Sequence, residues 1–493
     1  MSDLFSLALH YHQTGDLRQA EAYYRQILQD NPRHVEALTL LGVLADQAGH
    51  SEAGIQCISQ ALQIAPNYAE GHNHLGNVLR GLNRLADAQS HYEQAIRLKL
   101  DFADAYNNLG IVLRRQRKLD EAVSTYRQGL RIQPGNPFVQ NNLGNVLREQ
   151  GKLDEALACY QQALRLRPDY PEAYNNLGAV LQEQGNADHA LAYFREALRL
   201  RPAYPDALNN QGVVLAGRGQ TDEARASYEQ ALKLAPDFAD AHKNYGLLLH
   251  GQGEFEAALA EFRTVLQLRP EDPTAAHLAA ALTGAQTSEH SDPAYVESLF
   301  DGYAGHFDDH LLKVLNYRGP ELLRQALAGE PAPSDLDILD LGCGTGLCGV
   351  FLRPWARTLT GVDLSGKMLA QARQRGIYDQ LIQGDLLVPL TNADKAFDLI
   401  VAGDVFAYVG DLTAVIQAAA KALRPGGRLA FIVEAHEGEG LALRSSGRFA
   451  HAPAYLRQLA AAARLSEVSF ASAVARTDRN QNIESLVVVL RAD

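Results

Sequence analysis

The sequence is short of cysteine: its 493 residues contain four, namely Cys57, Cys159, Cys343 and Cys348. So few and so scattered cysteines exclude a disulfide framework and fit a reducing compartment. Long apolar runs are also missing, because no stretch approaches the roughly 18 apolar residues that indicate a membrane-spanning helix. The opening residues, MSDLFSLALH, do not place a basic segment before an apolar one, as a signal peptide does. We therefore expect a cytoplasmic protein with no membrane span.

Net positive charge is lacking as well. The formal net charge is −13, and both halves of the sequence are acidic. Nucleic-acid binding relies on clustered lysine and arginine, so this balance argues against a nucleic-acid partner. The apolar and charged fractions, 46% and 21%, are ordinary for globular proteins, and the length suffices for two or more domains.

The first half of the chain contains a repeat with a period of 34 residues. Prolines keep this step, with Leu100 where one is missing: Pro32, Pro66, Pro134, Pro168, Pro202, Pro236 and Pro270. A glycine row does the same: Gly42, Gly76, Gly110, Gly144, Gly178, Gly212 and Gly246. An alanine row, interrupted by Gly54, comprises Ala20, Ala88, Ala122, Ala156, Ala190, Ala224 and Ala258. An aromatic row, interrupted by Ile58, comprises Tyr24, Tyr92, Tyr126, Tyr160, Phe194, Tyr228 and Phe262.

Physical chemistry gives each row a role. Glycine and alanine let two antiparallel helices approach closely, and we expect the aromatic ring to fill the space between one helix pair and the next. Proline cannot continue a helix, so it marks the end of each second helix. The pattern resembles the tetratricopeptide repeat, which implies eight copies over residues 1–272. Residues 273–286 are predicted to form a capping helix, and residues 287–293 a linker.

An asparagine row follows the same period: Asn108, Asn142, Asn176, Asn210 and Asn244. An amide side chain both donates and accepts hydrogen bonds, so it can hold a peptide main chain of any sequence. The row is similar to the asparagine ladder in the superhelices of O-linked N-acetylglucosamine transferase, which lines a groove that binds peptides. The resemblance implies a protein or peptide partner in a concave groove. The alternative is that these side chains contact only water.

Residues 294–493 alternate short apolar runs with helical patterns. The predicted strands are 336–342, 359–364, 380–386, 397–404, 427–434, 465–474 and 484–490. The first five are separated by helices, as in a doubly wound parallel sheet, and the last two should add as an antiparallel pair. Seven strands in this rhythm resemble the α/β, Rossmann-like domain of class I methyltransferases. The resemblance implies that the helices near residues 299–323 lie over the cofactor as a lid.

The first predicted strand runs into Asp340, Gly342, Gly344 and Gly346. Glycines let the backbone turn sharply and approach a ligand, while the next helix begins beneath it. A glycine turn also occurs in NAD-binding folds. The G-x-G-x-G spacing and the preceding aspartate instead resemble the E/D-x-G-x-G-x-G motif of S-adenosylmethionine-dependent methyltransferases. In that family the acidic residue helps to place the amino group of the cofactor.

Further segments extend the resemblance. A carboxylate at Asp363 can accept hydrogen bonds from both ribose hydroxyls, and Leu364 and Met368 are placed to pack on the adenine. Asp385 and the backbone N–H of Leu386 match positions that contact the adenine edge. Asp404 follows the fourth strand, where residues face the methyl group and its acceptor, and Tyr303 and Phe307 would touch the cofactor from the lid. Each acidic residue could instead cap a helix, but all four are predicted at one edge of the sheet.

The resemblance extends over the whole chain to bacterial predicted methyltransferases that contain tetratricopeptide repeats. It implies methyl transfer from S-adenosylmethionine without naming an acceptor. We assign no general base, because the donor is already activated. Asp404, Tyr408 and His436, with Arg448, His451 and Tyr455, are candidates for the acceptor side or for the surface. His306 and His310 lack a third partner, so we expect no metal.

Three hypotheses follow. The repeats can recruit a protein or peptide acceptor to an active methyltransferase. They can also dock a small-molecule methyltransferase onto a biosynthetic complex. Thirdly, the chain can be a scaffold whose methyltransferase fold senses the cofactor without turnover. Oligomeric state is left open.

Overall fold

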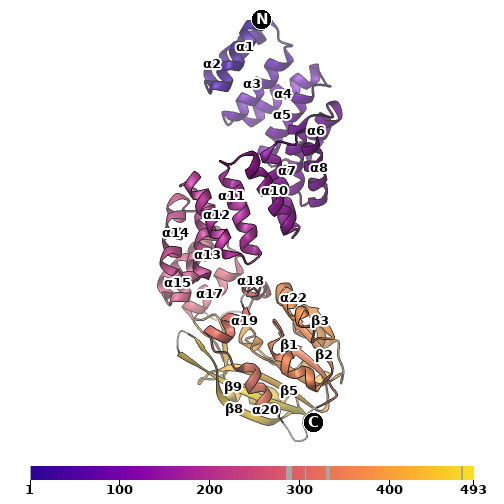
Figure 1. Ribbon diagram of the computed structural model, residues 1–493, viewed down its shortest axis with the longest axis vertical. Helices are drawn as coiled ribbons and strands as arrows, with labels where there is room; N and C mark the ends of the chain where they lie inside the picture. Colours follow the sequence, from indigo (N-terminus) through magenta and orange to yellow (C-terminus); the bar gives the residue numbers. More distant parts are fainter. Residues whose placement is uncertain (1, 285–290, 306, 329–333, 479–480) are drawn as a thin grey trace. The chain divides into compact units, whose positions relative to one another are not determined.

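The computed structural model describes residues 2–284, 291–305, 307–328, 334–478 and 481–493. The chain forms two compact units, Met1–Pro236 and Asp237–Asp493. Helices make up the first unit, and helices followed by a sheet make up the second (Figure 1). Among the described helices, none is long and apolar enough to cross a membrane.

The first unit consists of fourteen helices that pack as seven antiparallel pairs. They are α1 (Ser2–Thr14), α2 (Leu17–Asp30), α3 (Val35–Gln47), α4 (Ser51–Ile64), α5 (Ala69–Gly81), α6 (Leu85–Leu98), α7 (Ala103–Arg115), α8 (Leu119–Ile132), α9 (Pro137–Glu149), α10 (Leu153–Leu166), α11 (Pro171–Glu183), α12 (Ala187–Leu200), α13 (Pro205–Gly217) and α14 (Thr221–Leu234). The helices alternate between 13 and 14 residues. Each pair, together with its two connecting turns, accounts for the 34-residue period.

The glycine and aromatic rows meet inside each helix pair from α5 and α6 onward. The ring of Tyr126 lies against Gly110 of the same pair, where a Cβ on Gly110 would be 2.5 Å from Tyr126 Cε1. The same contact recurs between Gly144 and Tyr160 at 2.6 Å. This corrects the expectation that the ring fills the space between successive pairs. A glycine is required because any side chain would displace a buried ring.

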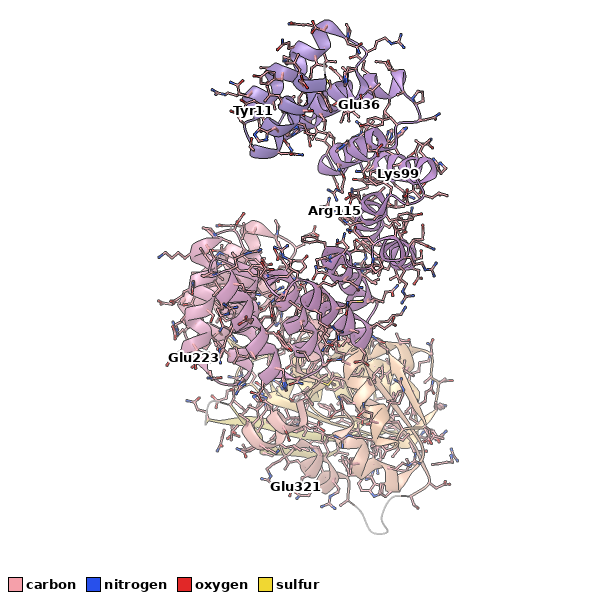
Figure 2. The ribbon with its side chains drawn as sticks, turned by 45° about the horizontal axis from the view of Figure 1, so that its top comes forward. Tyr11, Glu36, Lys99, Arg115, Glu223 and Glu321 are labelled. Atoms are coloured by element: carbon pink, nitrogen blue, oxygen red, sulfur yellow. The ribbon has the colours of Figure 1, made fainter. Side chains whose placement is uncertain are left out.

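Ion pairs also join neighbouring helices of the array. Lys99, labelled in Figure 2, pairs with Glu70 at 2.9 Å, and Arg148 pairs with Glu183 at 2.6 Å. All four side chains are more than a third exposed, and exposed pairs contribute only about 0–1 kcal/mol. The buried rows, rather than these pairs, therefore hold the array together.

The second unit begins with the eighth predicted repeat, α15 (Ala239–Gln252) and α16 (Phe255–Leu268), and with the predicted capping helix, α17 (Pro273–Thr283). The other helical segments are α18 (Pro293–Tyr303), α19 (Phe307–Asp309), the π-helix η1 (His310–Val314), α20 (Gly319–Leu327), α21 (Leu347–Leu352), η2 (Arg353–Trp355), α22 (Gly366–Arg375), α23 (Leu387–Thr391), η3 (Val405–Tyr408), α24 (Thr413–Ala422) and α25 (Pro453–Ala462).

A nine-stranded sheet forms the centre of this unit. Its strands are β1 (Leu336–Leu341), β2 (Ala356–Asp363), β3 (Gln380–Gln383), β4 (Phe397–Ala402), β5 (Leu423–Ala435), β6 (Leu441–Leu443), β7 (Phe449–His451), β8 (Leu465–Asp478) and β9 (Gln481–Ala492). The order β3-β2-β1-β4-β5 is parallel, and β9 pairs antiparallel with both β5 and β8. The predicted fold class is thus confirmed.

Side chains alternate between the two faces of the sheet, and each face has its own core. On β5, Leu429, Phe431 and Val433 pack with α24 and α25, whereas Ala430 and Ile432 pack on the face covered by α20 and α21. Helices on both faces are what a mostly parallel sheet requires, because neither face can be left in water. The carboxyl ends of the strands are left as the edge where a ligand can bind.

Two short strands were not predicted. β6 and β7 form a hairpin, and β7 continues the sheet beside the end of β5, where Glu434 pairs with Ala450. The hairpin contacts the helices that precede the sheet: His277 of α17 donates from Nε2 to the carbonyl of Gly447 at 2.8 Å. The ring of His277 also stacks on Tyr295 of α18, with centroids 4.3 Å apart. The capping helix therefore packs within the α/β unit.

Candidate functional site

The candidate site lies where the strand order reverses. β1 has β2 on one side and β4 on the other, so the chain leaves the sheet in opposite directions from neighbouring strands. Such a switch point opens a crevice at the carboxyl ends of the strands. The glycine loop that follows β1 and the segment that follows β4 both begin here.

The glycine loop has a backbone that other residues rarely adopt. Gly342 has φ of +61°, and a Cβ there would collide with the side chain of Val405 at the end of β4. Gly346 has φ of +94° and precedes the first turn of α21. Gly344, also at positive φ, differs, because among the described residues a Cβ on it would meet only Phe307 Cε1, 3.9 Å away. The loop is therefore packed at both ends and open at its centre.

Asp363 fastens the loop to the end of β2. Its Oδ2 accepts a hydrogen bond from the backbone N–H of Gly344, and its Oδ1 accepts one from the N–H of Ser365, both at 2.9 Å. Burial raises the pKa of the Asp363 carboxyl, and these two N–H donors oppose the shift. A carboxylate oxygen has a second lone pair, so each can accept another hydrogen bond from a ligand.

Asp340 lies beneath the loop rather than at its surface. It is 1% exposed, and its Oδ2 accepts a hydrogen bond from the hydroxyl of Tyr378 at 2.7 Å. Burial raises the pKa of Asp340 to about 7, although the bond from Tyr378 opposes this. The predicted contact with the cofactor's amino group is thus not a surface contact in this structure.

Two buried thiols, Cys343 and Cys348, lie near the acidic residues at the carboxyl ends of the strands. Burial raises the pKa of Cys343, and the charges of Asp340 and Asp363 raise it further. Burial likewise raises the pKa of Cys348, with contributions from Asp340 and Asp404. Because charge effects fall off with distance, the structure brings these three predicted carboxylates around one loop.

The residues predicted to contact the adenine differ in how far they are exposed. Leu364 is half-buried, but Met368 is fully buried, and its N–H is capped by the hydroxyl of Ser365 at 3.0 Å. Leu386 is buried in the core on the face of α24, whereas Asp385 is exposed and accepts from the N–H of Leu387 at 2.8 Å. Their roles toward a cofactor stay predictions.

Lid residues are fastened around the same loop. Ser365 donates to Asp301 of α18 at 2.5 Å, and Thr345 donates to Asp308 of α19 at 2.5 Å. Arg375 also binds Asp308 and donates from Nε to the carbonyl of Thr345 at 2.6 Å. The side chain of the predicted lid residue Tyr303 lies outside the described residues.

Asp404 lies at the end of β4 in contact with residues of the β6–β7 hairpin. Its Oδ1 accepts from Arg448 Nη2 at 2.6 Å, and Arg448 Nη1 donates to the hydroxyl of Tyr408 at 2.9 Å. His451 is buried and donates from Nε2 to the carbonyl of Gly410 at 2.8 Å, and burial lowers its pKa.

Two further candidates for the acceptor side have contacts away from Asp404. Tyr455 donates to Asp411 at 2.7 Å, and the backbone N–H of His436 bonds to the carbonyl of His451 at 3.0 Å. Of the acceptor-side candidates, Tyr408 and Arg448 therefore contact one another and lie with Asp404.

The predicted groove asparagines bond to one another along the array. Asn108 donates from Nδ2 to Oδ1 of Asn73 in the preceding repeat at 3.0 Å. The same bond links further pairs: Asn142 to Asn107, Asn176 to Asn141, and Asn210 to Asn175. The row thus contacts more than water, and an amide that donates one hydrogen bond still has a second N–H with which to donate. Asn244 lies on α15 in the second unit.

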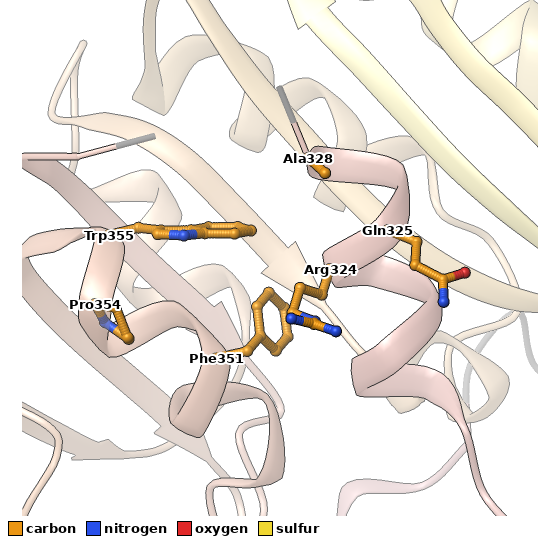
Figure 3. Close-up of a pocket in the computed structure, with 6 residues that line it drawn as sticks. All are labelled: Arg324, Gln325, Ala328, Phe351, Pro354 and Trp355. Atoms are coloured by element: carbon orange, nitrogen blue, oxygen red, sulfur yellow. The ribbon is translucent and has the colours of Figure 1, made fainter. Parts of the chain in front are cut away.

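A metal site and a surface hollow are two alternatives for a functional site in the described residues. Among the described residues, no group of three or more His, Cys, Asp and Glu side chains could hold a metal ion, and His306 lies outside those residues. A hollow of about 510 Å³ lies between α20 and η2 (Figure 3), lined by Arg324, Gln325, Ala328, Phe351, Pro354 and Trp355. Trp355 immediately precedes β2, so this hollow is at the amino ends of the strands, away from the glycine loop.

Sequence reasoning missed several residues that shape the site. Tyr378 follows α22, and no motif relates it to Asp340. Asp301 and Asp308 stand in the predicted lid segment, where acidic residues could have suggested polar contacts to the loop. Glu434 ends the fifth predicted strand, and a charged residue in an apolar run is a signal for a buried ion pair.

Comparison with known families agrees with this architecture. A family model described as methyltransferase domain matches residues 339–431. Models described as tetratricopeptide repeat match residues 11–77, 74–137, 125–158, 169–237 and 209–273, and one described as TPR repeat matches residues 144–185.

Curated relatives match the second half of the chain. Malonyl-[acyl-carrier protein] O-methyltransferase of Pectobacterium atrosepticum is 37% identical over 106 residues, which are 21% of this chain and 41% of the relative. Demethylmenaquinone methyltransferase of Tropheryma whipplei is 29% identical over 161 residues, which are 32% of this chain and 63% of the relative. The chain thus spans about half the length of the curated relatives that it matches.

Among solved structures, the crystal structure of the APC/C hetero-tetramer Cut9-Hcn1 aligns with a TM-score of 0.46 and 19% identity, over 57% of this chain and 55% of that chain. The helix pairs, the sheet order and the family matches lead to one conclusion. This chain carries tetratricopeptide repeats followed by a methyltransferase domain.

Proposed function

We propose that the protein transfers a methyl group from S-adenosylmethionine to a protein or peptide acceptor that the repeats recruit. The observation that carries the cofactor assignment is the glycine loop held by Asp363 at the switch point of the sheet. Nucleoside cofactors bind at this position in open α/β sheets. The match to the methyltransferase domain model supports the same assignment.

The residues of the crevice fit this cofactor. The centre of the loop is open above Gly344, so a ligand can approach the backbone closely. The carboxylates of Asp363 and Asp385 can accept hydrogen bonds from hydroxyl and amino groups. Asp340 lies beneath the loop, and a ligand with a cationic amino group and a sulfonium would favour its ionised form.

The protein's part in the reaction is to bind and to position. When bound, S-adenosylmethionine supplies a methyl group that its sulfonium has already activated. The glycine loop and Asp363 would hold the ribose, and Leu364 would pack on the base. Asp404 and Tyr408 would face the acceptor at the end of β4. Alignment of the acceptor and exclusion of water by α18 and α19 would account for most of the rate increase.

The acceptor class rests on the asparagine ladder. Its amides are joined by four bonds of the same kind, and an amide that makes one such bond still has a second N–H with which to donate. Main-chain groups of an extended peptide offer the same donor and acceptor types. An acceptor bound along the array would therefore be a peptide segment of any sequence.

A second candidate is methylation of a small or carrier-bound molecule, because the matched relatives are named for malonyl-acyl-carrier-protein and demethylmenaquinone. The repeats would then dock the enzyme onto a complex. The two buried arginines on the acceptor side, Arg448 and Arg476, already pair with carboxylates. Because these cations are already paired, they would not provide a binding site for a free carboxylate on the acceptor.

Calorimetric titration with S-adenosylhomocysteine tests the cofactor site. We expect Asp363→Asn to weaken binding at least tenfold, because hydrogen bonds to a charged group contribute about 1.5–3 kcal/mol each. Asp337→Asn is the matched control, since Asp337 also accepts several side-chain hydrogen bonds but lies at the amino end of β1. Unchanged affinity in Asp363→Asn would remove the cofactor assignment.

Transfer of radiolabelled methyl groups in a cell lysate separates the acceptor classes. Label in the protein fraction supports the peptide acceptor, and label in the small-molecule fraction supports the second candidate. Asn142→Ala with Asn176→Ala should reduce protein labelling severalfold, whereas Gln128→Ala with Gln161→Ala on the second helices should not. Cofactor binding without any labelled product would favour the scaffold hypothesis.

A further inference from the structure

A cluster of buried charges lies between the fifth strand and the hairpin. Glu434 is 4% exposed, and Arg448 and Arg476 are each 7% exposed. Glu434 Oε1 accepts from Arg448 Nε and from Arg476 Nη2, both at 2.6 Å. With Asp404, the buried part of the cluster contains two cations and two carboxylates, and the half-exposed Arg444 adds a third cation 3.9 Å from Glu434 Oε2.

All three nitrogens of the Arg448 guanidinium are used. Nε donates to Glu434, Nη2 to Asp404 at 2.6 Å, and Nη1 to the hydroxyl of Tyr408 at 2.9 Å. A guanidinium is planar and holds its donors at fixed angles, so these three bonds define the relative positions of their acceptors. A lysine has one nitrogen and cannot reproduce the arrangement.

Stability does not explain why this cluster is buried. Taking paired charges out of water costs about as much as their attraction returns, and apolar replacements of the same size are often neutral or stabilising. Fixing the geometry of polar groups is the role that buried networks fill better than apolar contacts do. The groups fixed here, Asp404 and Tyr408, belong to the segment after β4.

That segment is in contact with the cofactor loop. Val405, between Asp404 and Tyr408, packs against Gly342, and a Cβ on Gly342 would collide with it. The hydroxyl of Tyr408 accepts from Arg448, so its own hydrogen is left to be donated elsewhere. Arg448 therefore determines where a carboxylate and a phenol stand beside the glycine loop.

The hairpin that carries Arg448 is itself held from outside the sheet. The preceding residue, Gly447, has φ of +78° and accepts the buried hydrogen bond from His277. Leu278 of α17 would meet any side chain at position 447. The position of Arg448 is thus set on one side by Glu434 and on the other by the capping helix.

We propose that Arg448 is a positioning residue for methyl transfer, which holds Asp404 and Tyr408 at the acceptor side of the crevice without touching the cofactor. This inference rests on the proposed function. It assigns to the cluster a role in catalysis and none in cofactor affinity.

The test compares Arg448→Lys with Arg424→Lys in the full chain. Arg424 is a matched control, because it also bridges two carboxylates, Asp398 at 2.6 Å and Asp337 at 2.8 Å, on the first residues of β4 and β1. Three quantities are measured: S-adenosylhomocysteine affinity by calorimetry, the rate of radiolabelled methyl transfer to lysate acceptors at saturating cofactor, and hydrogen exchange of residues 404–409.

We expect Arg448→Lys to keep cofactor affinity within about twofold, to lower the transfer rate about 10- to 100-fold and to speed exchange in 404–409. Arg424→Lys should change neither the rate nor that exchange. An unchanged transfer rate in folded Arg448→Lys overturns the proposal. So does equal loss of cofactor affinity and rate, because the residue would then act on the cofactor site.

Two provisions keep the outcome decisive. If Arg448→Lys does not fold, His277→Phe keeps the stacked ring but removes the bond to Gly447, and it should give the same pattern more weakly. If the wild-type protein labels no acceptor, the proposed function fails, whereas the positioning of 404–409 is still decided by exchange. Unchanged exchange there in both variants would refute it.

Discussion

Tyr126 offers a sharp test of how the repeats are stabilised. Its side chain is fully buried, and its hydroxyl has no hydrogen-bond partner among the described residues. In the pairs on either side, the equivalent hydroxyls donate to asparagines, Tyr92 to Asn77 at 2.8 Å and Tyr160 to Asn145 at 2.7 Å. The fourth repeat has Ile111 where those repeats have asparagine, so Tyr126 lost its partner.

Substitution by phenylalanine should therefore raise stability at Tyr126 and lower it at Tyr92 and Tyr160. Tyr126→Phe removes a buried group that costs about 1–3 kcal/mol when unsatisfied, and we expect a gain of about 1 kcal/mol in stability. Tyr92→Phe and Tyr160→Phe remove a satisfied hydrogen bond and should each lose about 0.5–1.5 kcal/mol. The ring volume is kept in all three, so no cavity confuses the comparison.

Native-state hydrogen exchange is the suitable assay, because repeat arrays open locally as well as globally. A gain of about 1 kcal/mol corresponds to roughly fivefold slower exchange in α7 and α8 of Tyr126→Phe. A double-mutant cycle with Ile111→Asn should restore a favourable coupling of about 1 kcal/mol to the Tyr126 hydroxyl. If Tyr126→Phe destabilises as much as the two controls, the hydroxyl is bonded and the reasoning is wrong.

Three further predictions concern the second unit. Because burial raises the pKa of Asp340 to about 7, the folded protein binds a proton that the unfolded chain releases near pH 4, so stability should fall as pH rises from 4 to 7. In urea titrations Asp340→Asn should weaken this dependence and gain at most about 4 kcal/mol at pH 8, while the raised pKa of Asp363 leaves part of the dependence in place. A fragment of residues 237–493 should unfold cooperatively at higher urea than one of residues 294–493, which lacks the partner of Gly447. Gly342→Ala should lower the melting temperature and cofactor affinity together, through strain at φ of +61° and collision with the neighbouring segment.

Each of these predictions has a control. Tyr378→Phe removes the hydrogen bond to Asp340, so it should raise the pKa of that carboxyl further and steepen the pH dependence. Equal stability of the two fragments would show that the helices before residue 294 do not support the sheet. Gly376→Ala, at φ of +65° but with open space around it, should cost stability without affecting cofactor affinity.

The sequence predicted the repeats well because their signal is periodic. A period of 34 residues fixes the helix pairs, and the glycine and alanine rows identify the surfaces in contact. The direction of the aromatic rings was predicted wrongly, because a row in the sequence does not say whether a ring packs within its own pair or against the next. The asparagine row was visible, but the bonds along it were not.

The candidate site could be predicted only where residues adjoin strands. Asp340, Asp363 and Asp404 follow apolar runs, so topology brings them to one edge. The β6–β7 hairpin has strands of three residues, too short for any alternation to be recognised. The predicted contact of Met368 with a ligand stays a prediction, because an apolar residue on a helix has the same sequence pattern whether it faces the core or a ligand.

The asparagine ladder has a consequence for the growth of the array. Every bond runs from a later repeat to an earlier one over 35 residues, so each repeat carries both a donor for the one before and an acceptor for the one after. Duplication of residues 137–170 would insert a unit whose amides already match both neighbours. The chain can therefore lengthen in the middle without new polar mismatches, whereas its first repeats, where Thr39 and His74 stand in place of asparagines, are suited only to an end.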